Sequence, residues 1–391
     1  MENNSSQVVL VKDIFPGSDD SYPRDLTKFN DQLYFTADDG ENGGELWVSD
    51  GTTEGTQLVK DILPGSGNSY GGPSPGYYGA PSPRYLTEFN DQLYFTAVDG
   101  ENGGELWVSD GTTEGTQLVK DIRPGSDGSF PNNFTEFNDQ LYFTAVDGEN
   151  GGELWVSDGT TEGTQLVEDI YPGFNGSYPG YLTEFNDQLY FSAKDGENGG
   201  ELWVSDGTTE GTQLVKDINP GSNNYGSANS SYPFDLTEFN DQLYFTARDG
   251  KNGRELWVSD GTTDGTQLVK DINPGSGNSY PNNFTEFNDQ LYFTAVDGEN
   301  GRELWVSDGT TEGTQLVKDI NPGSDSSYPS DFTEFNDQLY FTADDGENGY
   351  ELWVSDGTTE GTQLVKDINP GSDGSYPGDL TEFNDQLYFR L

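Results

Sequence analysis

The chain contains no cysteine and no histidine among its 391 residues. Without cysteine it forms no disulfide bonds, which leaves the redox compartment open. Without histidine it lacks the side chain most used for acid–base catalysis near neutral pH and the commonest transition-metal ligand. Neither a Ser/His/Asp nor a Cys/His catalytic set can therefore be assembled.

Basic residues are also scarce. Lys and Arg number 17 against 70 Asp and Glu, so the formal net charge is −53. Such a surface disfavours nucleic acid, whose phosphates need cationic partners, and disfavours anionic membrane faces for the same reason. Self-repulsion predicts that cations or high salt stabilise the fold. The acidity suits a salty or calcium-rich exterior, so we expect an extracellular or cell-surface location, although Met1–Gln7 lacks a signal-peptide apolar core.

Apolar residues make up only 31% of the chain, and no stretch approaches the length of a transmembrane span. We therefore expect no membrane insertion. The low apolar fraction alone is compatible with disorder. However, the chain has 22 Tyr, 23 Phe and 7 Trp, and they recur at fixed spacing. Aromatic residues bury large areas, so we predict a folded chain.

A tandem repeat organises the sequence from Val8 to Phe389, and we treat residues 1–391 as a single repeat domain. Four of the six intervals between ELW motifs are 48 residues, and the others are 60 and 54. The extra residues fall near 71–82 and 224–229, which marks one loop as exposed. The motif tryptophans are Trp47, Trp107, Trp155, Trp203, Trp257, Trp305 and Trp353.

Each repeat unit predicts four short strands. In the third copy these are residues 134–137, 140–145, 153–157 and 165–170, which we call strands A, B, C and D. Alternating apolar, aromatic and β-branched residues favour strands over helices. Asn138 and Asp139 tolerate positive φ and predict a tight hairpin turn between strands A and B. Short loops throughout predict an antiparallel meander.

The strings ELWVSDGTTEGT, LVKDI and FNDQLYF resemble the bacterial ELWxxDGT repeat family. The resemblance covers nearly the whole chain, and it implies that each unit is a β-propeller blade. It implies little about function, because members of that family are mostly uncharacterised. A 48-residue unit of four strands also matches a propeller blade in length. We predict a closed, all-β fold, a β-propeller of four-stranded antiparallel blades.

The number of blades depends on how the ends are used. Strands A, B and D occur eight times and strand C seven times. We expect eight blades, the last an atypical closing blade made from Val8–Ile14 and the C-terminal strands up to Phe389. The alternative is seven complete blades from Leu26 to Ile368. The terminal strand edges could then support self-association.

The DGENG loop between strands B and C carries oxygen ligands of the kind calcium prefers. The alternative is a hairpin loop in which Asp and Asn cap backbone N–H groups. The fifth copy has Lys251 in place of the Glu, so that ligand is replaceable. Calcium is the one cofactor we consider. The candidate metal ligands are Asp39, Glu41, Asn42, Asp99, Glu101, Asn102, Asp147, Glu149, Asn150, Asp297, Glu299 and Asn300.

An aromatic residue followed by proline precedes strand A in most copies. One interpretation is a stiff turn that fixes strand entry. The other is a series of aromatic platforms for a polar ligand such as a glycan. The second copy departs from the pattern, with an insertion at Gly71–Tyr78 and Ser82–Pro83 before its strand. The candidate ligand-binding residues are Tyr22, Phe130, Tyr178, Tyr232, Tyr280, Tyr328 and Tyr376.

Two other repeated features predict structural roles. The DGTTEGT turn between strands C and D resembles the Asp-box of other propellers, so we expect its Asp and Thr side chains to brace the hairpin. The tryptophans of strand C are expected to pack between neighbouring blades, because a large ring can bridge adjacent sheets.

No catalytic residue is assigned. The chain has no phosphate-binding or nucleotide-binding loop. Arg24, Arg84, Arg254 and Arg302 depart from the repeat but form no convincing constellation. We expect a non-enzymatic binding or adhesion-type propeller with repeated loop sites on one face, a glycan or cell-surface partner, and calcium assistance. The alternatives are a purely structural scaffold and, less favoured, a glycoside hydrolase on a propeller scaffold.

Overall fold

A computed structural model describes residues 10–17, 19–64, 82–223, 225–383 and 386–390. These residues form strands and turns without a helix, so none of their segments is a helix able to cross a membrane. Val8, Val9 and the insertion at Gly71–Pro81 lie outside the described residues. Two compact units are defined, Met1–Leu182 with Gly207–Thr209, and Thr183–Asp206 with Glu210–Leu391.

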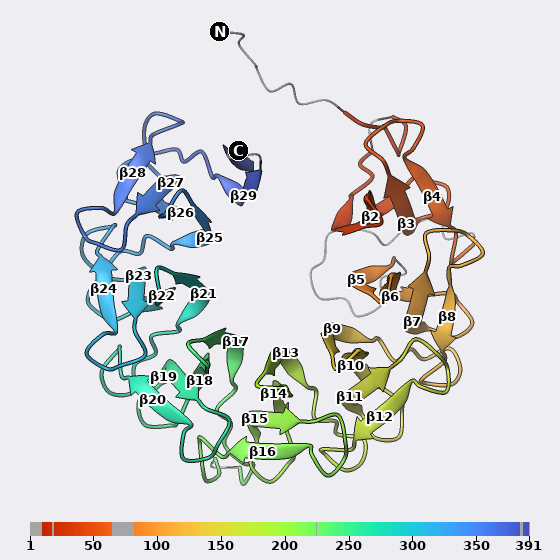
Figure 1. Ribbon diagram of the computed structural model, residues 1–391, viewed down its shortest axis with the longest axis horizontal. Helices are drawn as coiled ribbons and strands as arrows, with labels where there is room; N and C mark the ends of the chain where they lie inside the picture. The colour runs from red at the N-terminus through yellow and green to blue at the C-terminus, as the bar shows by residue number, and fades with distance from the viewer. Residues whose placement is uncertain (1–9, 18, 65–81, 224, 384–385, 391) are drawn as a thin grey trace. The chain divides into compact units, whose positions relative to one another are not determined.

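The described residues form seven four-stranded sheets, here called blades 1 to 7, which follow one another along the chain, and in each the strands are paired in sequence order (Figure 1). Blades 1 to 3 contain β1 (Arg24–Phe29), β2 (Gln32–Asp38), β3 (Gly44–Ser49), β4 (Gln57–Lys60), β5 (Arg84–Phe89), β6 (Gln92–Val98), β7 (Gly104–Ser109), β8 (Gln117–Lys120), β9 (Asn132–Phe137), β10 (Gln140–Val146), β11 (Gly152–Ser157) and β12 (Gln165–Glu168).

Blades 4 to 7 repeat the pattern, and a two-stranded sheet of β29 and β30 follows them. Their strands are β13 (Gly180–Phe185), β14 (Gln188–Lys194), β15 (Gly200–Ser205), β16 (Gln213–Lys216), β17 (Phe234–Phe239), β18 (Gln242–Arg248), β19 (Arg254–Ser259), β20 (Gln267–Lys270), β21 (Asn282–Phe287), β22 (Gln290–Val296), β23 (Arg302–Ser307), β24 (Gln315–Lys318), β25 (Ser330–Phe335), β26 (Gln338–Asp344), β27 (Tyr350–Ser355), β28 (Gln363–Lys366), β29 (Gly378–Phe383) and β30 (Gln386–Arg390).

The predicted strands of the third copy are confirmed, with strand A beginning two residues earlier, at Asn132, and strands B and C each one residue longer than predicted. Asn138 and Asp139 form the turn with φ of 50° and 54°, the left-handed geometry expected of a tight hairpin. Strand D, predicted to reach Ile170, ends at Glu168. It ends early because the Ile170 N–H donates to the buried Glu153 carboxylate at 3.2 Å instead of to a neighbouring strand.

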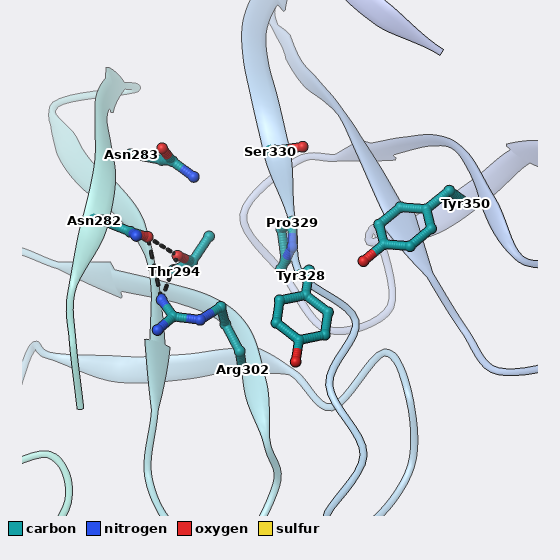
Figure 2. Close-up of a pocket in the computed structure, with 8 residues that line it drawn as sticks. All are labelled: Asn282, Asn283, Thr294, Arg302, Tyr328, Pro329, Ser330 and Tyr350. Carbon is teal, nitrogen blue, oxygen red and sulfur yellow. Dashed lines mark hydrogen bonds between the residues drawn. The ribbon is translucent and has the colours of Figure 1, made fainter. Parts of the chain in front are cut away.

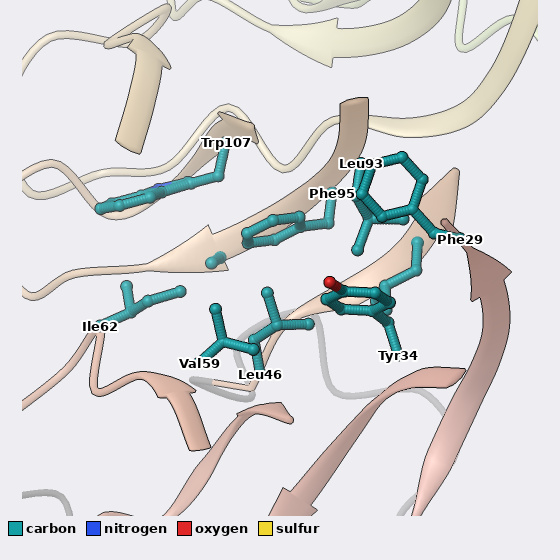
Figure 3. Close-up of a cluster of buried hydrophobic side chains, with 10 residues drawn as sticks. Phe29, Tyr34, Leu46, Val59, Ile62, Leu93, Phe95 and Trp107 are labelled. Atoms are coloured by element: carbon teal, nitrogen blue, oxygen red, sulfur yellow. The ribbon is translucent and has the colours of Figure 1, made fainter. Parts of the chain in front are cut away.

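The core lies between successive blades. Tyr34, Leu46 and Val59 of blade 1 pack against Phe95 and Trp107 of blade 2, and all five side chains are buried (Figure 3). The same arrangement recurs at later boundaries, with Trp155, Trp257, Trp305 and Trp353 in the corresponding position. Here the prediction of interblade tryptophans is confirmed. Four-stranded meanders packed face to face in this way are the blades of a β-propeller.

A lysine of strand D fastens its blade to the next one. Lys60 Nζ donates to the Thr116 carbonyl oxygen at 2.5 Å and lies 5.8 Å from the Trp107 ring centroid. In return, the Thr113 hydroxyl donates to the Val59 carbonyl oxygen at 2.7 Å. The same lysine-to-threonine bond is made by Lys12, Lys120, Lys216, Lys270 and Lys318.

The DGTTEGT turn is braced by its own side chains, as predicted. Asp50 Oδ1 accepts from the Thr52 N–H at 2.8 Å and from the Thr52 hydroxyl at 2.7 Å. Thr56 Oγ1 donates to the Thr52 carbonyl oxygen and lies 2.7 Å from Ser49 Oγ. These bonds satisfy polar groups inside the hairpin, and the Thr52 bonds lower the pKa of the Asp50 carboxyl.

The expectation of an eighth blade is not met, and the seven complete sheets fit the alternative. Two residues of the N-terminal segment contact blade 1 in the way that strand D residues contact the next blade elsewhere. Lys12 Nζ donates to the Thr56 carbonyl oxygen at 2.5 Å, and the Thr53 hydroxyl donates to the Val11 carbonyl oxygen at 2.6 Å. However, residues 10–14 form no strand, and β29 and β30 pair only with each other among the described residues. The physical reason is that strand C, which joins B to D in every complete blade, has only seven copies.

Candidate ligand-binding site

The loop between strands D and A is held by a buried glutamate of the ELW motif. Glu153 accepts hydrogen bonds from the Ser177 N–H at 2.7 Å, from the Ser177 hydroxyl and from the Ile170 N–H. Burial raises the pKa of Glu153 to about 7, against the lowering effect of the Ser177 bonds. The loop that carries the aromatic–proline pair is thereby fixed to strand C.

All seven predicted aromatic residues lie in this loop with left-handed backbone, at φ between 46° and 50°. Such φ values are rare for bulky residues and mark local strain. A backbone bond holds the conformation, for example from the Tyr178 N–H to the Gly152 carbonyl oxygen at 2.8 Å. Six of the side chains are exposed, and Phe130 is half-buried. The loop therefore presents an aromatic ring beside the first residue of strand C.

In the first four blades that first residue is glycine, and the neighbouring side chain lies close to it. A Cβ on Gly104 would lie 2.6 Å from the Phe130 ring, and one on Gly152 would lie 2.6 Å from the Tyr178 ring. In blade 1 the residue beside Gly44 is Ser82, which stands in the second copy where the other copies have the aromatic residue. The ring therefore packs on bare backbone, which leaves little room for a ligand between them.

In the last three blades the same position carries a large residue. The Arg254 guanidinium lies 5.7 Å from the Tyr232 ring centroid and 5.5 Å from that of Phe234. Tyr350 stacks on Tyr376 with centroids 5.4 Å apart. Arg302 is the third large residue at this position. The repeat thus loses its symmetry at this position, and each large residue makes a different set of contacts.

A cavity of about 450 Å³ lies beside Arg302, where blade 6 meets blade 7 (Figure 2). Tyr328 is the predicted aromatic residue that lines it, whereas the other six candidates do not. Both the volume and the mixture of aromatic and polar groups suit a small ligand. The lining residues are Asn282, Asn283, Thr294, Arg302, Tyr328, Pro329, Ser330 and Tyr350.

Arg302 is anchored through one nitrogen. Its Nη1 donates to the Tyr280 carbonyl oxygen at 2.9 Å, and to Asn282 Oδ1 and Thr294 Oγ1 at 3.2 Å each. Burial lowers the pKa of the Arg302 guanidinium, and the Tyr328 and Tyr280 phenols partly offset this. The side chain keeps its positive charge, because the ordinary arginine value is far above neutral.

Arg302 also accompanies a change in the link between blades. In four copies the strand B threonine donates across the boundary to the next blade's proline carbonyl, as Thr144 does to Pro179 at 2.6 Å. Thr294 instead donates to Asn282 Oδ1 within its own blade. Pro329, the corresponding proline, lines the cavity. The cavity therefore lies where a repeated interblade hydrogen bond is missing.

Sequence reasoning placed Arg302 in no site and did not select Asn282, Asn283, Ser330 or Tyr350. One signal for the site was present, because Arg302 and Tyr350 stand where four other copies have glycine. What the sequence could not show is which departure leaves space beside it. In the sequence Arg254 occupies the same position of the repeat as Arg302, but in the structure its guanidinium stacks on two aromatic rings.

The predicted metal loops form closed turns. Asp99 Oδ1 accepts from the N–H groups of Glu101 and Asn102 at 2.9 and 2.7 Å, and Asn102 Nδ2 donates to Asp99 Oδ2 at 2.7 Å. Burial alone would raise the pKa of Asp99, but the Asn102 and Glu101 bonds outweigh it and lower the pKa. Within the described residues, no three acidic side chains gather closely enough to hold a metal ion. Calcium binding by these loops stays a prediction.

The same turn occurs in the other predicted loops. Asp39, Asp147 and Asp297 each accept from the two N–H groups that follow and from the Asn side chain. The Asn amide nitrogen therefore faces the Asp carboxylate. This geometry favours the alternative interpretation, in which Asp and Asn cap the loop backbone.

Comparison with solved structures finds several distant likenesses. The computationally designed Ika8 protein is 18% identical with a TM-score of 0.48, over 96% of this chain and 94% of its own. A prolyl endopeptidase is 11% identical with a TM-score of 0.49, over 88% of this chain and 49% of its own. The β-propeller domain of the Trilobed protease from Pyrococcus furiosus is 10% identical with a TM-score of 0.41, over 90% of this chain and 99% of its own.

The chain spans about half the length of the prolyl endopeptidase and of a puromycin hydrolase, of which it covers 49% and 56%. No family model matches the sequence, and no curated protein matches it. The class of the protein is therefore defined by its own sheets, as a β-propeller with a polar and aromatic cavity in its C-terminal unit.

Proposed function

We propose that this protein is a non-enzymatic binding propeller whose principal site is the cavity at Arg302 and Tyr328, and that its ligand is a saccharide. The observation that carries the proposal is the cavity itself. It combines two phenol rings, Tyr328 and Tyr350, with the amides of Asn282 and Asn283 and the Ser330 hydroxyl. Flat rings beside hydroxyl and amide groups match the apolar faces and hydroxyl edges of sugars.

Two further aromatic loops fit the proposal as weaker, repeated sites. Tyr22 and Tyr280 are exposed on strained backbone in the same loop position as Tyr328. Weak sites gain through effective concentration when one polymer spans several of them. A polysaccharide or a glycosylated cell surface therefore suits this chain better than a single small molecule.

A glycan array followed by titration calorimetry tests the proposal. The wild-type protein is compared with Tyr328→Ala and with Tyr178→Ala, a matched control whose ring lies on Gly152 and lines no described cavity. We expect Tyr328→Ala to weaken binding of the best array ligand at least ten-fold and Tyr178→Ala to weaken it less than three-fold. Absence of any saccharide ligand, or equal losses in the two variants, would contradict the proposal and favour the structural-scaffold alternative.

A further inference from the structure

Arg302 is the only charged residue among the eight that line the cavity. In a chain of net charge −53, the eight lining residues include one cation and no carboxylate. An anion inside the cavity therefore meets a positive partner and no acidic side chain from the lining. Burying an anion is costly unless such a partner is present.

The guanidinium is held through one nitrogen, and its opposite edge makes no hydrogen bond to the described protein. All its hydrogen bonds are made by Nη1, and within the described residues Nε and Nη2 donate to no protein group. Nε and Nη2 carry parallel N–H bonds on one edge of the guanidinium plane. Such a fork matches the two oxygens of a carboxylate, whereas a sugar hydroxyl can use only one of its donors.

The neighbouring groups fit the rest of a sugar ring. Asn282 Oδ1 and Thr294 Oγ1 are engaged with Nη1, so they fix the arginine more than they contact a ligand. Asn283, Ser330 and the Tyr328 ring complete the lining as neutral groups. They can hydrogen-bond to hydroxyls and stack on a pyranose face.

We infer that the cavity selects a saccharide that bears a carboxylate, such as a hexuronic acid residue, with the carboxylate on Nε and Nη2 of Arg302. This inference rests on the proposed function of the same site and adds the chemical class of the sugar. It identifies Arg302 as the residue that determines specificity.

The experiment uses a panel of hexuronic acid oligosaccharides of different linkage, each beside its carboxyl-reduced neutral counterpart, in chelator and at fixed ionic strength. Affinities are measured by calorimetry for the wild type, Arg302→Gln and Arg302→Lys. Arg254→Gln is the matched control, because Arg254 occupies the same strand position but stacks on Tyr232 and Phe234.

We expect the wild type to prefer the acidic member of a pair at least ten-fold. Arg302→Gln should remove this preference, Arg302→Lys should keep only part of it, and Arg254→Gln should leave it unchanged. The ratio of acidic to neutral affinity is the readout, because a general disturbance of the cavity would weaken both ligands alike. Equal affinity for both members in the wild type, or a ratio unchanged in Arg302→Gln, overturns the acidic selectivity but leaves saccharide binding standing. Failure to bind either member of any pair overturns the hexuronic acid assignment, whereas the saccharide proposal falls only if the glycan array finds no ligand.

Discussion

The aromatic residues before each strand A combine a bulky side chain with a backbone conformation that glycine adopts most readily. Tyr178, for example, has a φ of 47° and an exposed ring. An L residue pays a steric cost there that glycine does not. Strain of this kind persists only when surrounding bonds impose it, and here the Gly152 carbonyl and the buried Glu153 do so.

This geometry predicts an unusual order of stability. Tyr178→Gly should be more stable than Tyr178→Ala by about 1 kcal/mol, because alanine retains the steric cost of a Cβ at positive φ. Urea unfolding midpoints of the two variants, measured side by side, check the order. An alanine variant at least as stable as the glycine variant would show that the backbone relaxes once the ring is removed.

The buried glutamates make a second prediction at this scale. Burial raises the pKa values of Glu45, Glu105, Glu153, Glu201, Glu255 and Glu303 to about 7 in the folded chain. An unfolded glutamate titrates lower, so between these values the folded state binds more protons and its stability falls as pH rises. The contribution is complete at pH below the unfolded value and is lost as pH passes through about 7.

We therefore expect the melting temperature to fall by several degrees between pH 5 and pH 8 at fixed ionic strength. Glu153→Gln should reduce this dependence in part, because it replaces one of the six carboxyls with a neutral amide that has no proton to lose, and Ser177 Oγ, 3.5 Å from the Gly152 carbonyl oxygen, can reorient its hydroxyl. Calorimetric scans across this pH range provide the measurement. A melting temperature that rises toward pH 8 would show that the donors around each carboxylate outweigh its burial.

At the scale of the element, the joint between two blades depends on the strand D lysine. Lys120 Nζ donates to the Thr164 carbonyl oxygen at 2.5 Å and lies 6.0 Å from the Trp155 ring centroid. Lys120→Met keeps the aliphatic stem and removes the charge, so it should destabilise the fold by about 1–2 kcal/mol.

Lys28→Met is the control for this change, because Lys28 is exposed and its contact with Asp31 spans 3.8 Å. That variant should lie within about 0.5 kcal/mol of the wild type. Urea unfolding of both variants gives the comparison. Equal destabilisation of the two would mean that the lysine contributes only through the overall charge.

The strands were predictable because each repeat contains turn sequences that mark where its strands end. Asn138–Asp139 defines one turn and the DGTTEGT string another, and both form as predicted. The end of strand D was not predictable, since it depends on Glu153, a residue in a different strand. The cavity could not be predicted from the sequence for a similar reason. Arg254 and Arg302 occupy the same position of the repeat, and only the residues that surround them in the folded blades distinguish them.

At the scale of the whole molecule, the main physical feature is the large negative net charge. The net charge is −53, and the described residues contain two salt bridges. Like charges at this density oppose the compact state, and added ions screen them.

Cations should therefore stabilise the fold without selectivity. We expect calcium and magnesium at equal ionic strength to raise the melting temperature by the same several degrees, because the Asp side chains of the DGENG loops already accept bonds from their own backbone. Thermal unfolding in each ion and in chelator is the measurement. A response to calcium that magnesium does not reproduce would instead support the metal sites predicted from the sequence.

The number of blades could not be determined by counting predicted strands in the sequence. Eight copies of three strands and seven of the fourth were compatible with either arrangement. The described residues contain seven complete sheets, and β29 and β30 form a sheet of two strands. Local patterns predicted the strands of the complete blades but also a strand over Val8–Ile14, where residues 10–14 form none.

The contrast between Gly152 and Arg302 has a consequence for how such a protein acquires new specificities. A ring rests on bare backbone at Gly152, and the corresponding place at Arg302 borders a cavity. The residue at this position thus contributes to whether a joint is filled, as at Gly152 and Arg254, or borders a cavity, as at Arg302. A protein engineer could therefore vary this position together with its neighbours to diversify the ligands of the scaffold one blade at a time.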